Sequence, residues 1–372
     1  MNETSTVVVP IQFNSKKGWG NFQKHIFEQL RKGNKDKQLK WKKICYDKQK
    51  NRELFITDEE AFESDINKKL SEEDYFFEEA FRTIYDMEQA SSCFFILTDN
   101  RKKDGVSTLL NKRGLKLRFG ERCRTIRKVY LYVTNAHIGL LIVELDAKPI
   151  VEGDEIDTVT DEVLMLSEKD GTKKEMVSWL LGDGWKENAY CFPFKKKCFL
   201  ATYQCDDAKS ENEKEEKELP REQIQISSFV MEGRGTSSSF CKFFEHDFQI
   251  FWLCILQKVE ILHISQMASR ISRKKNIFRM RNEIEKVNRE YVLFYNQYDM
   301  VQCTYCTDGQ RLYNNLREEM LITRDNSDVR EQMKALHEYA MLVSGKVTNF
   351  LLTFLSIAAS VASVLSFLVA IR

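Results

Sequence analysis

Five polar residues are spaced along one otherwise apolar segment near the C-terminus, and they carry the clearest chemical signal in the sequence. They step by four, three, four and three positions, and they are Asn349, Thr353, Ser356, Ser360 and Ser363. This spacing places them on one face of a helix. Small polar side chains in such a stripe either hydrogen-bond across a helix–helix interface or line a narrow hydrated path inside a ring of helices. Both interpretations remain open, and the stripe has no charge with which to select an ion.

The segment that carries this stripe is predicted to cross a membrane as a single helix. Val347 to Ile371 supplies 25 residues without a charge, whereas about 20 suffice to span the hydrocarbon core. In lipid each backbone N–H and C=O must be bonded within the segment, which favours a helix. No other segment is expected to be long and apolar enough to compete.

The flanking charges predict the orientation of this span. Arg330, Lys334 and Lys346 precede it, and only Arg372 follows. By the positive-inside rule the body is cytoplasmic and the C-terminus lies outside. Met1 to Leu30 contains no apolar signal-peptide core. We therefore expect a single-pass protein of the cell inner membrane, in contact with membrane lipid.

A helical stalk is predicted immediately before the span. Its seam residues recur at steps of four and three, and Asp325 to Asp328 supplies N-cap chemistry. One such helix cannot cover its own seam, so it must pack on the preceding long helix, on copies of itself, or on both; we expect a homo-oligomer. The seam comprises Val329, Met333, Leu336, Ala340 and Val343.

The segment before this stalk is also predicted to be helical. Phe243 to Gln302 contains no proline or glycine, which favours one long helix. Asp308-Gly309 is the expected interruption, after which Leu312, Leu316 and Met320 resume the helical period. The seam predicted within the long helix comprises Ile284, Val287, Tyr291, Phe294, Tyr298 and Val301.

The N-terminal part alternates strand-like runs with helical patterns, which predicts an α+β fold with one sheet in an N-terminal α/β domain. Asn135 is the expected left-handed residue of a hairpin turn that also contains His137. The predicted strands are Thr6–Phe13, Leu39–Tyr46, Cys93–Thr98, Lys128–Val133, Gly139–Leu145, Phe199–Cys205 and Ile224–Val230, and the predicted helices are Asn21–Arg31, Ser71–Gln89 and Thr158–Leu166.

The domain boundaries follow from composition. Residues 1–240 form the predicted cytoplasmic domain, 241–346 the long helices and coiled-coil stalk, and 347–371 the transmembrane helix. Residues 206–223 are highly charged and lack aromatics, so we expect a mobile loop there. Gly233 to Ser239 has the composition of a linker.

Other chemical signals are weak, and no catalytic residue is predicted. The pair Cys303 and Cys306 is the single C-x-x-C motif, without the second pair or nearby histidines that a zinc site requires. The phosphate-loop, G-x-S-x-G, H-E-x-x-H and kinase motifs are absent from the sequence, which argues against an enzyme. A net charge of +1 provides no general attraction to nucleic acid. Ten cysteines fit small buried side chains in a reducing compartment.

Three segments of the chain resemble the CorA-like family of membrane proteins. They are the hairpin KVYLYVTNAHIGLLIVELD (Lys128–Asp146), the helix FQIFWLCILQKVEILHISQMAS (Phe248–Ser269), and VQCTYCTDGQRLYNNLREEMLI (Val301–Ile322), which is followed by a stalk and a membrane helix. This resemblance implies a pentameric funnel with Asn349, Thr353 and Ser356 facing its axis, and Mg²⁺ or another divalent cation as the ligand.

The sequence also departs from that family. CorA transporters carry a Gly-Met-Asn motif and a second membrane helix after the first, and neither occurs here before Arg372. Some CorA-like relatives accompany type III CRISPR systems, in which a nucleotide messenger acts on a membrane effector. The resemblance therefore implies an oligomeric channel or pore-forming effector, gated by a divalent cation or a nucleotide and serving antiviral defence. The alternatives are a tail-anchored oligomeric scaffold without transport and a divalent-cation transporter of the CorA type.

Overall fold

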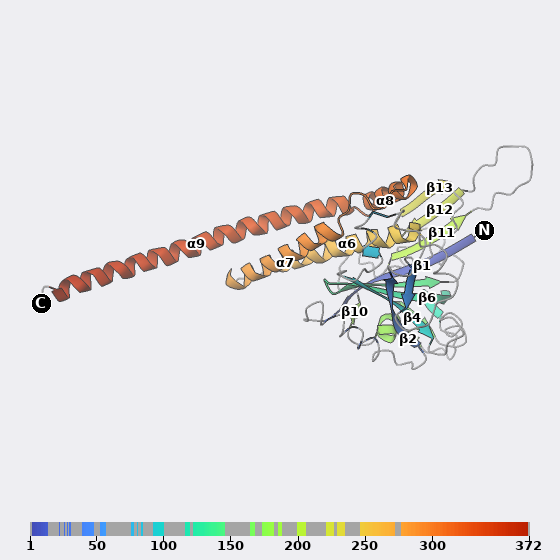
Figure 1. Cartoon of the computed structure of the whole chain (residues 1–372), viewed down its shortest axis with the longest axis horizontal. Helices are drawn as coiled ribbons and strands as arrows, with labels where there is room; N and C mark the ends of the chain where they lie inside the picture. Colours follow the sequence, from blue (N-terminus) through green and yellow to red (C-terminus); the bar gives the residue numbers. More distant parts are fainter. Residues whose placement is uncertain are drawn as a thin grey trace, which may run out of the picture.

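The computed structural model combines an antiparallel sheet with long helices, which confirms the α+β class (Figure 1). The sheet lies at one end of the molecule, and the last helix extends far from it toward the C-terminus. The structure describes residues 2–13, 22, 26, 28, 30, 39–47, 53–56, 76, 77, 80, 83, 84, 92–99, 116–119, 122–145, 164–167, 173–181, 185–187, 199–205, 221–226, 229–234, 246–271 and 277–370.

The described strands join into one sheet in the order β13-β12-β11-β1-β7-β6-β4-β2-β3, with β10 pairing β1, β5 pairing β6 and β8, and β9 pairing β8. All the pairings are antiparallel. The strands are β1 (Asn2–Phe13), β2 (Leu39–Asp47), β3 (Glu53–Ile56), β4 (Ser92–Asp99), β5 (Lys116–Phe119), β6 (Arg122–Thr134), β7 (Ile138–Leu145), β8 (Met165–Ser167), β9 (Lys173–Glu175), β10 (Trp185–Glu187), β11 (Phe199–Cys205), β12 (Arg221–Ile226) and β13 (Phe229–Arg234).

The centre of the sheet is buried on both faces, which explains why every residue of β7 is buried and why Glu144 is its one charged residue. Alternate residues of each strand enter opposite cores. Val8, Tyr132 and Leu140 join the core that contains α6 (His246–Ile271). Val7, Leu131 and Leu141 join a second core with helical residues near the N-terminus and with α5 (Met176–Leu181).

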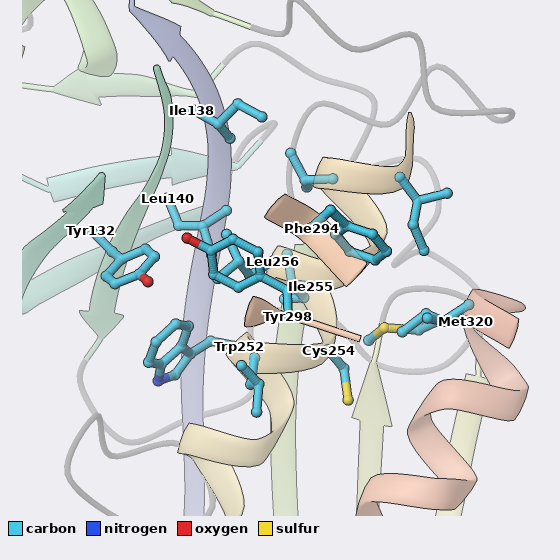
Figure 2. Packing of buried hydrophobic residues seen from close by; sticks show 14 of the residues in the cluster. Tyr132, Ile138, Leu140, Trp252, Cys254, Ile255, Leu256, Phe294, Tyr298 and Met320 are labelled. Atoms are coloured by element: carbon cyan, nitrogen blue, oxygen red, sulfur yellow. The ribbon is translucent and has the colours of Figure 1, made fainter. Parts of the chain in front are cut away.

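Helix α6 is the central helix of the first core. Its residues from Phe248 to Leu256 are buried without interruption, so this part of the helix is buried on all sides, and Gln249 is its one polar residue. Trp252 packs against Tyr132 and Phe94, with ring centroids 5.0 and 5.5 Å away. Figure 2 shows Trp252 and Tyr132 in this core, together with Phe294 of α7 (Ile277–Gln297) and Tyr298, which follows that helix.

The C-terminal region folds back on itself before it extends. Helix α7 packs on α6, and α8 (Thr307–Glu319) and the first part of α9 (Ile322–Ala370) also contact α6. The 49-residue α9 continues through Gly345 without a break. In Figure 1 its second half projects well beyond the ends of α6 and α7.

Several predicted elements are confirmed and others are wrong. Six predicted strands correspond to β1, β2, β4, β6, β7 and β11, whereas Ile224–Val230 spans two strands, β12 and β13, paired as a hairpin. The helix predicted over Thr158–Leu166 is wrong at its end, where Met165 and Leu166 pair in β8. The charged loop predicted to Gln223 is wrong from Arg221, where β12 begins, and Gly233 and Arg234 of the predicted linker belong to β13. Residues 206–220 and 235–239 lie outside the described residues.

The turn between β6 and β7 also corrects the prediction. His137, and not Asn135, has a positive φ of 61°. The loop holds three residues and is closed by a hydrogen bond from the His137 N–H to the Thr134 carbonyl (3.0 Å). In a three-residue hairpin loop the last residue takes the left-handed conformation.

The single long helix predicted from Phe243 to Gln302 is wrong, since α6 and α7 are separate helices that pack side by side. Folding back buries the apolar seam of α7: Ile284, Val287 and Phe294 are nearly inaccessible. The expected last seam residue, Val301, is 85% exposed because α7 ends at Gln297. The expected interruption at Asp308-Gly309 is also wrong, because these residues form the first turn of α8.

The N-cap predicted at Asp325 to Asp328 is wrong as well. Helix α9 already begins at Ile322, after Leu321 with a φ of 56°. The Leu321 N–H donates to the Glu318 carbonyl (2.9 Å), which closes the turn between α8 and α9. Asp325 and Asn326 therefore lie inside the helix, where they are available for contacts with other helices.

Candidate functional site

The predicted polar stripe lies along the projecting half of α9. Asn349, Thr353, Ser356, Ser360 and Ser363 are all exposed. The apolar residues between them are exposed as well, with 59% of Leu352, 62% of Phe354, 61% of Leu355, 59% of Ile357 and 53% of Val361 accessible. Within the described chain, this half of α9 therefore has an uncovered apolar surface around a polar stripe.

The hydroxyl groups of the stripe are bonded within their own helix. Thr353 Oγ1 donates to the Asn349 carbonyl (2.8 Å), and Ser360 Oγ to the Ser356 carbonyl (2.9 Å). Ser363 Oγ donates to the Ala359 carbonyl (2.9 Å). Such back-bonding satisfies the hydroxyl hydrogen without water or a second helix. The oxygens can still accept a hydrogen bond from a neighbour.

The predicted seam lies in the first half of α9 and is covered by the same chain. Val329 and Met333 are 3% and 5% exposed, and Leu336 and Ala340 pack partly buried against the first core. The contacts come from α6 and α7. The side chain of Val343 lies outside the described part. The long helical segment, one of the partners considered for this seam, therefore contacts it.

A polar junction, defined as Gln257, Asp299, Tyr313, Arg317 and Asn326, joins four segments at the base of α9. Arg317 Nη2 lies 2.9 Å from Asp299 Oδ1, with both side chains almost buried. Arg317 Nη1 also donates to the Met300 carbonyl (2.6 Å) and to the Tyr313 hydroxyl (2.9 Å). A buried ion pair of this kind persists only with such supporting bonds.

The remaining residues of the junction connect the ion pair to α6 and α9. The Tyr313 hydroxyl accepts from Gln257 Nε2 (2.7 Å) and donates to the Met300 carbonyl (2.8 Å). Asn326 Nδ2 donates to the second oxygen of Asp299 (2.6 Å). Burial raises the pKa of Tyr313 and keeps its hydroxyl protonated as a donor. An ion pair between Lys258 and Asp325 further ties α6 to α9.

A buried carboxyl group lies on α6 where it meets the β6–β7 hairpin. Thr134 Oγ1 donates to Glu260 Oε1 over 2.9 Å, and Glu260 is 3% exposed. Burial raises the pKa of Glu260 to about 8; the bond from Thr134 opposes this shift, and the charge of Glu290 adds to it. Burial also lowers the pKa of nearby His263 to about 4, together with the charges of Arg270, Lys286 and His137. Both groups are therefore uncharged in their folded surroundings near neutral pH.

An open cavity of about 520 Å³ lies beside the start of α8. It is formed by that helix, by the extended segment before it, and by Phe77. The expected C-x-x-C pair borders this region: Cys306 lines the cavity, whereas Cys303 is buried, and burial raises its pKa to about 12. A thiol with this pKa is a poor metal ligand or nucleophile.

The part of the chain that the structure describes contains no group of three or more His, Cys, Asp or Glu side chains placed to hold a metal ion. One further expectation is wrong: the stretch Asp247–Ile271 of α6 is also long and apolar enough to be a candidate membrane span. Because 83% of its 18-residue apolar stretch is buried inside the protein, the apolar character of α6 is explained by its place in the core. No protein-family model matches the chain, and no curated protein matches it significantly.

The junction residues and Glu260 were not predicted from the sequence. Asp299, Arg317 and Asn326 are separated by up to 27 positions and come together because α7, α8 and α9 fold back on one another. The available signal was local: Tyr313 and Arg317 are four residues apart and therefore share a helix face.

Proposed function

We propose that the projecting half of α9 crosses a membrane and that the chain acts as an oligomeric channel or pore-forming effector of CorA-like character. The observation that carries the proposal is the exposed apolar half of α9, which continues without a break from a half that is buried against the body. Exposing such a surface to water is costly, whereas lipid covers it without cost.

The polar stripe supports assembly of several copies around this helix. Small hydroxyl-bearing residues allow helices to approach closely and to accept bonds from each other. In a ring of five helices, as the resemblance implies, Asn349, Thr353 and Ser356 would face the axis and form a narrow polar path. Arg330, Lys334 and Lys346 precede the apolar stretch and favour a cytoplasmic body at the inner membrane.

Gating by a cytoplasmic ligand is part of this proposal. The polar junction links the sheet-packed helix α6 to the base of α9, so a change in α8 would be transmitted to the membrane helix. The ligands suggested by the resemblance are a divalent cation and a nucleotide. Divalent-cation transport of the CorA type would use the same path, and no enzymatic step is included.

A second candidate function is a tail-anchored oligomeric scaffold without transport. The back-bonded hydroxyls of Thr353, Ser360 and Ser363 favour it, because they need no water in the stripe. In this case the stripe packs helices together, and the body holds a partner protein.

Dye release from proteoliposomes separates the two functions. The full chain is reconstituted with and without Mg²⁺ or a nucleotide, alongside the double variant Thr353→Leu and Ser356→Leu and the control Ile357→Leu. We expect release from the wild type and the control, and about tenfold less from the double variant, because a blocked path removes water from the pore. Full integration of all three proteins without release under any ligand would support the scaffold.

A further inference from the structure

The cavity beside α8 combines an aromatic wall with amide and cationic groups. Its volume, about 520 Å³, lies within the range of small-molecule sites. The wall is made by Phe77 and Tyr305, whose ring centroids are 3.9 Å apart at an interplanar angle of 38°. Tyr305 is 61% exposed and presents a ring for stacking.

The segment that carries Tyr305 is held in place by backbone bonds. Phe76 and Thr304 form an antiparallel bridge, and the Phe77 N–H donates to the Cys303 carbonyl (3.0 Å). Gln310 of α8 accepts from the Cys303 N–H (3.0 Å) and donates to the Val301 carbonyl (3.2 Å). The cavity wall is therefore fixed to α8 rather than formed by the Tyr305 side chain alone.

The lining has a cationic character. Arg311 lines the cavity, and the described lining includes no carboxylate. The partner of Arg311 is Asp308, at 3.0 Å, and both side chains are more than 70% exposed. Such a surface pair is weak, so an anionic ligand can replace Asp308. Exposed amides of Gln302, Asn314 and Asn315 supply donors and acceptors for the edge of a ring.

We propose that this cavity binds a small anion carrying a flat heteroaromatic ring, the chemistry of a mononucleotide. The ring stacks on Tyr305, the amides bond to its edge, and the phosphate pairs with Arg311. Stacking of a base on an aromatic side chain and a hydrogen bond to a charged phosphate both favour binding, so a ligand that carries both groups binds more tightly than either group alone.

The effect of the ligand rests on the proposed function, since binding would act through α8 on the membrane helix. Arg311 and Gln310 lie on the same helix as Tyr313 and Arg317 of the polar junction. A ligand that pairs with Arg311 favours one position of α8. The hydrogen bonds of the polar junction connect α8, through Arg317 and Asp299, to Asn326 on α9, so a shift of α8 would also shift α9.

Calorimetric titration of the full chain in detergent tests the binding site without measuring flux. The probes are AMP, GMP, CMP and UMP, with adenosine and inorganic phosphate as the two separated parts. We expect at least one mononucleotide to bind saturably, and its nucleoside and phosphate to bind about tenfold more weakly or not at all. Failure here with normal dye release would overturn this site and leave the proposed function standing.

Variants assign the binding to the cavity. Tyr305→Ala and Arg311→Gln should each weaken nucleotide binding about tenfold, whereas Tyr305→Phe should retain it because the ring remains. The matched controls Tyr339→Ala and Arg324→Gln alter exposed residues of α9 and should bind as the wild type does. Absence of binding by all four mononucleotides at about 10 mM, or unchanged affinity in both cavity variants at unaltered thermal stability, would overturn the proposal.

Discussion

The two halves of α9 belong to one uninterrupted helix, yet they differ in their surroundings. In the first half, Val329 and Met333 are buried by α6 and α7, and Asn326 bonds to Asp299. In the second half, Leu355 and Ile357 are apolar but about 60% exposed. The apolar residues of the first half are covered by contacts within the chain. Those of the second half are not covered by the described part of the chain, so lipid or another molecule must cover them. This difference is the basis for proposing a membrane span.

The largest expected effect comes from placing charge in the second half. Leu355→Arg with Ala359→Arg should abolish membrane integration, because each arginine near a bilayer centre costs about 2.5 to 3.5 kcal/mol. The matched control, Ala335→Arg with Tyr339→Arg, has the same spacing on exposed positions of the first half. Carbonate extraction should leave the control in the membrane and release the double variant; equal behaviour of the two would contradict the comparison.

The next effect distinguishes the buried ion pair at the base of α9 from an exposed one. Arg317→Met leaves Asp299 charged and buried, and it should lower the free energy of unfolding by about 3 to 5 kcal/mol. Arg311→Met breaks a pair of nearly the same length, 3.0 against 2.9 Å, at the surface and should cost roughly 0 to 1 kcal/mol. Denaturant unfolding in detergent measures both. Equal losses of free energy of unfolding in the two variants would show that the buried pair at the base of α9 contributes no more than an exposed pair.

Truncating one apolar residue in each half sharpens the contrast further. Met333→Ala should destabilise the fold by about 2 to 4 kcal/mol, since it opens a cavity between α9 and its neighbours. Leu355→Ala removes an exposed side chain and should change folding stability by less than about 0.5 kcal/mol. The melting temperatures in detergent provide the measurement, and a larger effect at Leu355 would mean that the second half packs on the body.

The pH dependence of the free energy of unfolding tests the buried Glu260 in the part of the protein that packs on the sheet, independently of the second half of α9. Between its ordinary pKa of 4.5 and about 8, Glu260 holds a proton when folded that it loses when unfolded. The free energy of unfolding therefore falls as the pH rises from 4.5 to about 8, and above this range the contribution of the protonated Glu260 is lost completely. Glu260→Gln should flatten the dependence and gain about 1 to 3 kcal/mol at pH 8, with little change below pH 5.

The control for this titration is Glu331→Gln, which alters an exposed carboxylate of α9. It should leave the pH profile of unfolding as in the wild type. A Glu260→Gln profile that is parallel to the wild type between pH 5 and 8 would contradict the assignment of a protonated Glu260.

The sequence predicted what depends on local pattern. Strands such as β1 and β7 follow from apolar runs, and the helical first half of α9 follows from the steps of four and three in its seam. The separation of α6 from α7 was missed, because it is caused by burial of Ile284 and Phe294 against α6 and not by proline or glycine. The Asp299–Arg317–Asn326 cluster depends on the same fold-back, so spacing along the chain could not predict it.

The most direct test of the membrane assignment is the environment of each half of α9 in liposomes. A fluorescent unnatural amino acid replaces Leu355 in one protein and Ala335 in another, and quenching by doxyl-labelled lipid is compared with quenching by iodide. We predict strong lipid quenching and weak iodide quenching at position 355, with the reverse at position 335. Strong iodide quenching at both positions would contradict the membrane span.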